Sequence, residues 1–253
     1  MNVERISDYE QDFDKTYLDS DGKKHTQSQK MVEIPGEKAF MKYMEVRPSS
    51  GDKSYFYPAK FGKDQIVLHY TMGYLKGDIA SLTKPNNYIS VPYLIGRNGT
   101  IYNLFASDYW SYHLGEGALG GNTVRSKATI AIELSNIGPL KKIGNNLVTT
   151  YNDNDVYCSL NQRQYYCEGP FRNFNYFATF TDQQYDSLIA LLRFLTSNYK
   201  IPRKFLDKEK FHETTAEVSS FNGIVTHVNY RSSGKTDIGP SFDWERIKKG
   251  LNA

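Results

Sequence analysis

Short runs of apolar residues along the chain predict strands mixed with helices. The run 66–70 is mostly apolar and contains β-branched residues, as in a strand buried in a central sheet. Residues 128–134 alternate between large aliphatic side chains and smaller or polar ones, the period of a strand with two different faces. A further strand is predicted over residues 223–228. Together with the helices below, these runs predict an α/β fold with a central mixed β-sheet flanked by helices.

A hairpin is predicted near the middle of the chain. Apolar residues alternate along residues 89–95, and a second short strand begins at Ile101. The pair Asn98-Gly99 stands between them. Such a pair is typical of a tight turn in which both central residues have positive φ. Residues 115–127, which are rich in Gly, are predicted to form a loop.

Three segments have the pattern of helices. The strongest covers residues 182–199, with apolar residues at helical spacing. Thr181 and Gln184 form a capping box at its start. A short helix is predicted over residues 78–84, before Pro85, and a final helix begins near Ser241.

Two regions are less regular. Residues 1–63 are polar and weakly patterned, with a predicted loop over 19–30, and we interpret them as an N-terminal elaboration packed on or preceding the domain of residues 64–253. Residues 140–176 carry many Asn, Asp, Gly and Tyr and are predicted to form a long irregular insertion. Its aromatic residues either contact a ligand beside the functional site or only cover an exposed edge of the fold.

Composition narrows the class of protein. Hydrophobic residues make up 39% and charged residues 23%, as in ordinary globular proteins. The net charge of +3 is too small to indicate nucleic acid but is compatible with an anionic surface such as a cell wall. The 20 Tyr and 14 Phe suit a sugar or peptide groove, or simply a Tyr-rich surface.

The sequence shows neither an apolar run long enough to cross a membrane nor the apolar core of a signal peptide. We therefore expect a chain made as a soluble cytoplasmic protein, without membrane insertion. Its two cysteines, Cys158 and Cys167, are too few for a disulfide framework. Two reduced thiols are favoured over a local disulfide.

Candidate chemistry gathers at the ends of the predicted strands. His69 and His227 stand at or near the carboxyl ends of two of them, and Asp237 follows ten residues after His227 on a Gly- and Pro-containing loop that also carries Lys235. Two imidazoles and a carboxylate form an ordinary catalytic zinc set that leaves one position for water. The spacing alone is a weak signal, because isolated histidines are more often structural.

Glu133 is a second anomaly, since it interrupts an apolar strand. An unpaired buried carboxylate is costly. The residue therefore either faces solvent on an open sheet face or lines a site, and the pattern does not decide between these alternatives.

These residues fall within a set of motifs that resembles a known family. The chain is similar to the zinc N-acetylmuramoyl-L-alanine amidases that share a fold with peptidoglycan-recognition proteins and phage amidase lysins. The similarity extends over about residues 64–250 and keeps the family's order. Its segments are Ile66–Thr71, Val91–Ile101, Tyr112–Gly115 with Thr129–Asn136, and Thr226–His227 with Lys235–Pro240.

The resemblance implies roles for individual residues. His69, His227 and Asp237 would bind Zn²⁺ in a surface groove at the sheet ends. Glu133 would be the general base, and Lys235 would stabilise charge at the scissile carbonyl. The expected substrate-binding residues are His113, Tyr70, Tyr93 and Asn136.

One departure from the family pattern concerns the predicted hairpin. Some members carry a Tyr-His pair where this chain has Val91 and Pro92. A catalytic tyrosine is therefore absent at that position, which leaves more of the reaction to Glu133.

The function implied by the resemblance is hydrolysis of the amide between N-acetylmuramic acid and L-alanine in bacterial peptidoglycan. The aromatic loops favour a phage-type endolysin, which would act on the cell wall after release or export. We expect it to be a monomer. Two alternatives remain open: a non-catalytic peptidoglycan-binding module and a cytoplasmic amidase that recycles soluble muropeptides. Metal content discriminates the first alternative, because non-catalytic members of this fold lose a zinc ligand.

Overall fold

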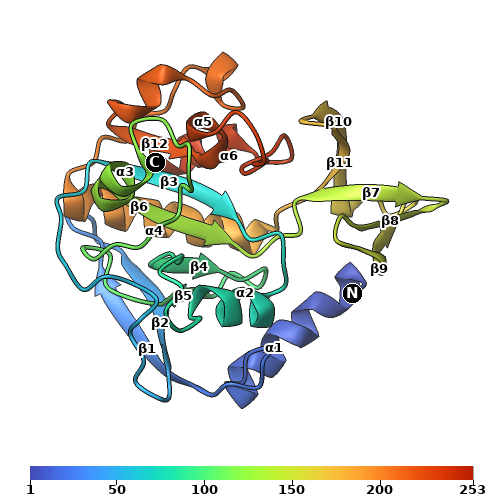
Figure 1. Ribbon diagram of the computed structural model, residues 1–253, viewed down its shortest axis with the longest axis horizontal. Helices are drawn as coiled ribbons and strands as arrows, with labels where there is room; N and C mark the ends of the chain where they lie inside the picture. Colours follow the sequence, from blue (N-terminus) through green and yellow to red (C-terminus); the bar gives the residue numbers. More distant parts are fainter. Residues whose placement is uncertain (253) are drawn as a thin grey trace.

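A computed structural model describes residues 1–252 and contains two sheets joined into one body (Figure 1). The strand order of the central sheet is β1 (His25–Glu33), β2 (Phe40–Pro48), β5 (Ile101–Asn103), β4 (Tyr93–Ile95), β6 (Thr129–Leu134), β3 (Gln65–Tyr70) and β12 (Gly223–Thr226). β4, β6, β3 and β12 are mutually parallel, whereas the β1–β2 and β4–β5 pairs are antiparallel. The predicted mixed sheet is confirmed.

Helices cover both faces of the central sheet. The helices are α1 (Ile6–Thr16), α2 (Leu75–Leu82), α3 (Asn122–Ala128), α4 (Asp182–Tyr199), α5 (His227–Tyr230) and α6 (Trp244–Leu251), with 3₁₀ turns at Val3–Arg5, Arg163–Tyr165, Lys208–Lys210 and Ala216–Ser219. Tyr93 and Ile95 of β4 pack in one apolar cluster with Leu188 of α4. Leu94, which points the opposite way, packs in another cluster with Phe13 of α1 and Ile79 of α2. The sheet is thus the middle layer of three.

The most strongly patterned predictions are confirmed. All residues of β3 are buried, as expected for a central strand. α4 has the predicted bounds, and Thr181 and Gln184 form the predicted capping box. α2 begins three residues before the predicted short helix, and α6 begins three residues after Ser241.

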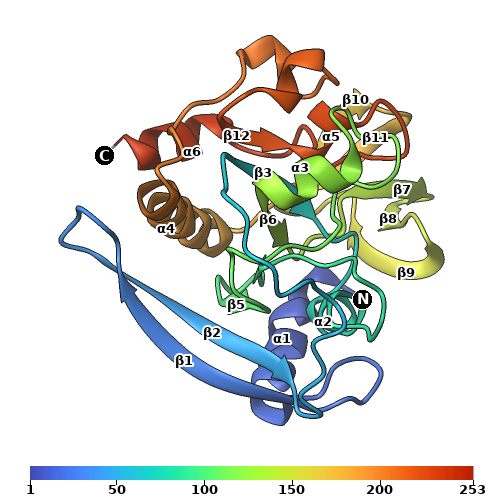
Figure 2. The ribbon, with the colours of Figure 1, turned by 60° about the vertical axis from the view of Figure 1, so that its left-hand side comes forward.

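The N-terminal region is more regular than its sequence pattern. The predicted loop over 19–30 is wrong from His25 onward, because β1 begins there and pairs with β2 along its whole length. Most β1 side chains are exposed, so no apolar alternation marks the strand; backbone hydrogen bonds at the edge of the sheet hold it. Figure 2 shows this hairpin running across the molecule. We propose that residues 1–63 elaborate the domain formed by residues 64–253.

The predicted tight turn is also different in detail. Gly99 has positive φ, but Asn98 does not. The connection between β4 and β5 is a five-residue loop, in which the amide of Gly99 donates to the carbonyl of Gly96 at 3.0 Å. Glu10 of α1 accepts hydrogen bonds from the amides of Arg97 and Asn98, which fixes a longer turn. The predicted loop over 115–127 is likewise wrong at its end, where α3 begins.

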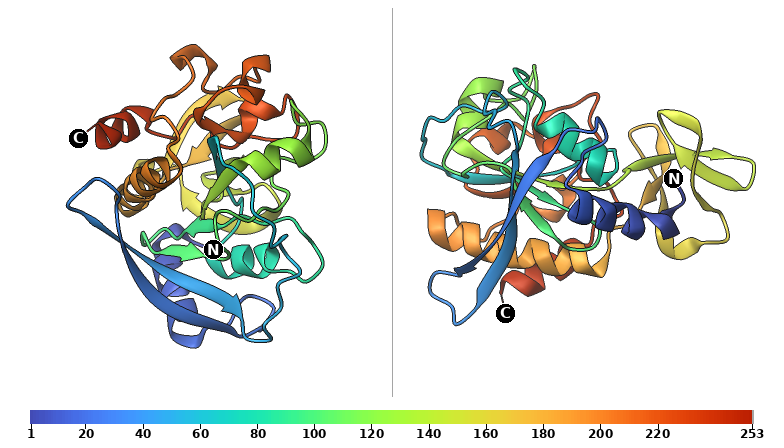
Figure 3. Two further views of the ribbon diagram at one scale, coloured as in Figure 1. Left: turned by 90° about the vertical axis from the view of Figure 1, so that its left-hand side faces the viewer. Right: turned by 90° about the horizontal axis from the view of Figure 1, so that it is seen from below.

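The insertion is a small antiparallel sheet, and the prediction of an irregular segment is wrong. Its strand order is β10 (Tyr166–Phe171), β11 (Phe174–Ala178), β7 (Pro139–Ile143), β8 (Asn146–Thr149) and β9 (Asn152–Ser159). Gly144, Asn145 and Asn173 lie in its hairpin turns, whereas exposed positions within the strands hold the other Asn residues that suggested a loop, among them Asn146, Asn152, Asn154 and Asn175. Figure 3 shows this sheet projecting from one side of the molecule, near the N-terminus.

The two cysteines lie in this second sheet. Cys158 is in β9 and Cys167 is in β10, which are the two opposite edges of the sheet, and both thiols are free. A disulfide between them would need the sheet to rearrange. None of the helices within residues 1–252 is long and apolar enough to cross a membrane.

Candidate active site

Strand register brings the candidate residues to one edge of the central sheet. His69 of β3 stands directly opposite Glu133 of β6. β12 pairs with β3 up to Thr226 and Leu68, so the next residue, His227, lies beside His69. The predicted strand over residues 223–228 is wrong at its end, because the strand ends at Thr226 and His227 is the first residue of α5. Side chains at the carboxyl ends of parallel strands commonly form sites in α/β proteins.

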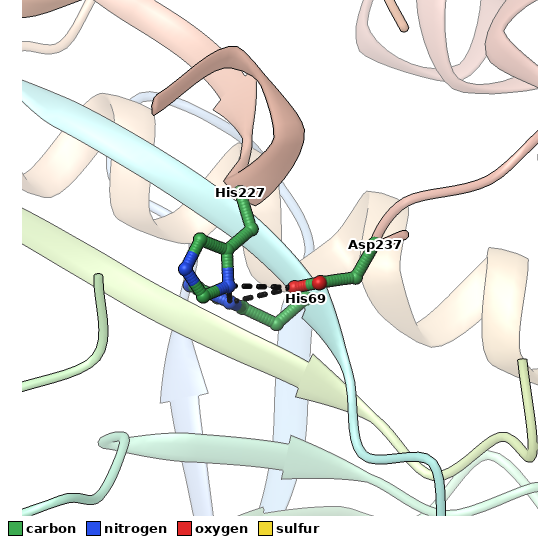
Figure 4. Close-up of side chains that lie close together, drawn as sticks. All are labelled: His69, His227 and Asp237. Atoms are coloured by element: carbon green, nitrogen blue, oxygen red, sulfur yellow. Dashed lines mark hydrogen bonds and ion pairs between the residues drawn. The ribbon is translucent and has the colours of Figure 1, made fainter. Parts of the chain in front are cut away.

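Two histidines and an aspartate converge on one point (Figure 4). The Nδ1 atoms of His69 and His227 are 2.9 Å apart. Oδ2 of Asp237 lies 3.0 Å from Nδ1 of His69 and 2.9 Å from Nδ1 of His227. All three residues are buried. The loop after α5 supplies Asp237, whose carbonyl accepts a hydrogen bond from the amide of Val228 at 2.9 Å.

A chain of hydrogen bonds fixes which nitrogen of His69 faces this point. The Thr129 hydroxyl donates to the carbonyl of Arg125 at 2.8 Å, so its oxygen accepts from Nε2 of His113 at 2.7 Å. Nδ1 of neutral His113 is then an acceptor, 3.1 Å from Nε2 of His69. The proton of neutral His69 therefore sits on Nε2, and Nδ1 presents a lone pair.

His227 is oriented in the same sense by a simpler contact. Its Nε2 lies 2.9 Å from the carbonyl oxygen of Leu114, which can only accept a hydrogen bond. Nε2 therefore carries the proton, and Nδ1 presents a lone pair. Two lone pairs and a carboxylate at about 3 Å separation repel one another unless a cation lies among them. The donor set and its protonation thus fit a metal ion such as Zn²⁺.

The electrostatics of His69 and Asp237 favour a neutral imidazole and an ionised carboxylate. Burial, and the neighbouring His227, lower the pKa of His69 to about 4, so its imidazole is neutral near pH 7. Burial disfavours the charged form of Asp237, but His227 and His69 outweigh burial and hold its pKa well below the usual range. Neutral imidazoles with an ionised carboxylate are the protonation states that a divalent cation requires.

Glu133 and Lys235 line the same pocket as the three candidate ligands. This pocket has a volume of about 160 Å³ and includes Tyr70 and His113 in its wall. Oε2 of Glu133 is buried and has no hydrogen-bond partner in the protein. Burial raises the pKa of Glu133 well above its usual value, and Asp237 and Asp78 add to the increase, whereas Lys235 opposes it. Of the two alternatives for this carboxylate, the structure therefore favours a residue that lines a site.

Of the four candidate substrate-binding residues, only Tyr70 and His113 line the pocket. Tyr93 and Asn136 do not line the pocket: Tyr93 is buried in the core, and Asn136 donates to the carbonyl of Thr179 at 3.1 Å. The pocket therefore gives no support for a direct contact between substrate and either of these two residues. Both ring nitrogens of His113 have partners in the protein, so neither is free to hydrogen-bond a ligand.

Two contributors to the site have no signal in the sequence. Thr129 begins β6 and acts at the site only through His113. Arg172, from the distant insertion, donates hydrogen bonds to the backbone that carries Lys235. Thr129 falls within a matching segment but is given no role there, and Arg172 belongs to no matching segment; only the folded chain shows how either residue supports the site.

The fold and the site define a class of protein: a three-layer α/β protein with a buried His/His/Asp triad that could hold a metal and an unpaired carboxylate in one pocket. Comparison with family models identifies the family of this protein. Residues 61–240 match the family model described as N-acetylmuramoyl-L-alanine amidase, and the chain belongs to that family. It is accordingly a peptidoglycan amidase, with a site that could hold a metal.

Comparison with solved structures finds several amidases. The complex of the N-acetylmuramyl-L-alanine amidase AmiD from E. coli with its anhydro-muramyl peptide substrate is 21% identical over 87% of this chain, with a TM-score of 0.51. This chain covers 65% of AmiD. AmpD is 19% identical over 76% of this chain and 86% of its own, with a TM-score of 0.46. The endolysin amidase LysCS from Clostridium intestinale is 20% identical over 82% of this chain and 95% of its own, at 0.44. No curated protein matches the sequence.

Proposed function

We propose that this protein is a zinc-dependent amidase that hydrolyses the bond between N-acetylmuramic acid and L-alanine in peptidoglycan. One observation carries the proposal: the donor atoms of His69, His227 and Asp237 meet in the pocket that also contains Glu133 and Lys235. A binding module needs no unpaired buried carboxylate beside a metal site, whereas a hydrolase needs a general base there.

The roles of the side chains follow from their positions. Bound Zn²⁺ would supply a Lewis acid that activates water and polarises the amide carbonyl. Glu133 accepts a proton from the attacking water and passes it to the leaving nitrogen of L-alanine. The carbonyl carbon gains a hydroxyl, the C–N bond breaks, and the products are a lactyl carboxylate and a free amino group. Lys235 places positive charge beside the oxygen on which negative charge develops.

Activity on purified sacculi tests this proposal. The protein should release amino groups over time without releasing reducing sugar ends, because an amidase cuts no glycosidic bond. Inactive protein that still sediments with sacculi would support a binding module instead. Release of reducing ends would indicate a glycosidase.

We further propose that the substrate is polymeric peptidoglycan, as for an endolysin. A second cavity of about 390 Å³ adjoins the catalytic pocket and shares Ile89, Tyr112, His113 and Lys235 with it. The two cavities therefore form one extended groove, which supports a substrate longer than a single muropeptide. Turnover should be faster on sacculi than on soluble muropeptides at equal concentrations of cleavable bonds. The opposite preference would indicate a recycling amidase.

A substitution at Thr129 tests the hydrogen-bond chain behind His69. Thr129→Val keeps the side-chain shape but removes the hydroxyl that accepts from His113. We expect Zn²⁺ affinity, measured by competition with a chelator, to fall about 10-fold, the lower end of the range for residues behind a metal ligand. Thr179→Val, away from the site, is the matched control. Unchanged affinity in Thr129→Val would show that His69 needs no such support.

A further inference from the structure

The β10–β11 hairpin of the insertion ends beside the loop that carries two of the active-site residues. Phe171 pairs with Phe174, so Arg172 and Asn173 alone form the turn. Figure 2 shows β10 and β11 beside α5. The insertion therefore contacts residues 228–237, although none of its own residues lines the catalytic pocket.

The Arg172 guanidinium donates hydrogen bonds to several oxygen atoms in and near the 228–237 loop. Nη1 donates to the carbonyls of Arg231 and Lys235, each at 2.7 Å. Nη2 donates to the Thr214 hydroxyl at 3.1 Å and lies 3.4 Å from the carbonyl of Val228. These contacts join the two ends of the loop that runs from α5 to Asp237. The planar fork of an arginine can bridge separate carbonyls in this way, whereas a lysine ammonium cannot do so with the same geometry.

The backbone of Arg172 shows that this placement has a conformational cost. Its φ is 45° and that of Asn173 is 70°. Asn tolerates this left-handed region, whereas a residue such as Arg rarely adopts it. Such strain persists where surrounding contacts hold it, and it is common near functional sites. Here the hydrogen bonds of the side chain compensate for the conformation of its own backbone.

Neighbouring contacts fix the hairpin as a whole against the same region. The Phe171 ring packs edge-on against His212, with ring centroids 5.5 Å apart. The Ser241 hydroxyl donates to the carbonyl of Ala178 at 2.9 Å. A Cβ on Gly239 would lie 3.1 Å from the Phe177 ring, so the chain just after Asp237 lies close against β11. The hairpin is therefore a rigid support and not a free flap.

We propose that Arg172 is a positioning residue that holds the 228–237 loop so that Asp237 and Lys235 meet His69 and His227. The insertion then serves the active site as a clamp, independently of any contact it makes with peptidoglycan. This inference rests on the proposed function, because it assigns Asp237 to a metal site. The expected consequence of losing the guanidinium is a more mobile loop and a weaker metal site.

The test distinguishes the effect of losing the guanidinium from the effect of disturbing the turn. Arg172→Asn and Arg172→Gly both remove the guanidinium and suit positive φ, so the hairpin should still form. Arg172→Lys keeps the charge without the fork. Arg163→Asn removes an exposed guanidinium from the same insertion, bonded to Glu168, and is the control.

Hydrogen exchange and metal affinity provide readouts that do not depend on turnover. In Arg172→Asn and Arg172→Gly, amides of residues 228–238 should exchange at least about 10-fold faster, and Zn²⁺ affinity should fall about 10-fold or more, as for other residues that orient metal ligands. Arg172→Lys should resemble them, and Arg163→Asn should match the wild type. Ethylguanidinium should partly restore the affinity of Arg172→Gly. With zinc bound at saturation, kcat should fall more than KM rises.

Two results would overturn the proposal. Unchanged exchange and unchanged zinc affinity, with only a lower melting temperature, would make Arg172 a structural residue of the insertion. A rise in KM at constant kcat would make it a substrate contact. Failure of the wild-type protein to bind zinc would instead contradict the proposed function, so the two failures are distinguishable.

Discussion

Replacing Glu133 by Gln is expected to lower kcat by about 10²- to 10⁴-fold, the range that general acid–base catalysis contributes. Gln has the shape of Glu but cannot accept the proton of water. The substitution should not destabilise the fold, because Oε2 of Glu133 has no hydrogen-bond partner to lose. We therefore expect zinc content to persist and the melting temperature to stay constant or rise. Steady-state hydrolysis, metal analysis and thermal unfolding together measure this.

The matched control for this variant is Glu168→Gln, which changes an exposed carboxylate in the insertion. It should keep wild-type activity. A Glu133→Gln protein that unfolds but retains its rate per folded molecule would show that the carboxylate is structural.

Replacing Asp237 by Ala should abolish turnover by a different route. Asp237 contributes the only negative charge among the three donor atoms, and its carboxylate lies within 3.0 Å of both imidazoles. Without it, two neutral nitrogens remain, which is too few for a stable zinc site. We expect the purified variant to contain little zinc and to show no measurable hydrolysis. Chelation of the wild-type protein should have the same effect, and added Zn²⁺ should reverse it.

The two variants form a diagnostic pair. Glu133→Gln should hold zinc and fail to turn over, whereas Asp237→Ala should do neither. Full activity of the Asp237→Ala variant, or of thoroughly metal-free wild-type protein, would contradict the role of the triad.

Sequence patterns predicted the parts of the fold whose side chains carry the signal. The strand β3 and the helix α4 are buried through apolar residues at the appropriate period, so both were recognisable. β1 was not recognisable, because it is held by its backbone and exposes most of its side chains. The insertion was misinterpreted for a related reason: exposed strand positions such as Asn146, Asn152 and Asn175 carry Asn, so the composition of this small sheet is the same as that of an irregular loop.

Some residues of the candidate site could likewise be predicted from the sequence, whereas others could not. The positions of His69 and His227 at strand ends, with Asp237 on the following loop, gave a weak signal for a zinc site, and the family resemblance strengthened it. Nothing in the sequence places Thr129 behind His113 or Arg172 behind Lys235, because both act through contacts between segments that are far apart in the chain. Tyr93, a tyrosine in a matching motif, lies in the core and not in the pocket wall, so its contact with substrate stays a prediction.

Mass spectrometry of digested peptidoglycan tests the central claim most directly. Purified sacculi should be incubated with zinc-loaded protein, with Glu133→Gln as the control. The expected products are stem peptides with a free L-alanine amino terminus, together with glycan strands whose muramic acid residues carry a free lactyl carboxylate. Cleavage within the stem peptide or within the glycan, with the N-acetylmuramic acid–L-alanine bond intact, would contradict the proposed function.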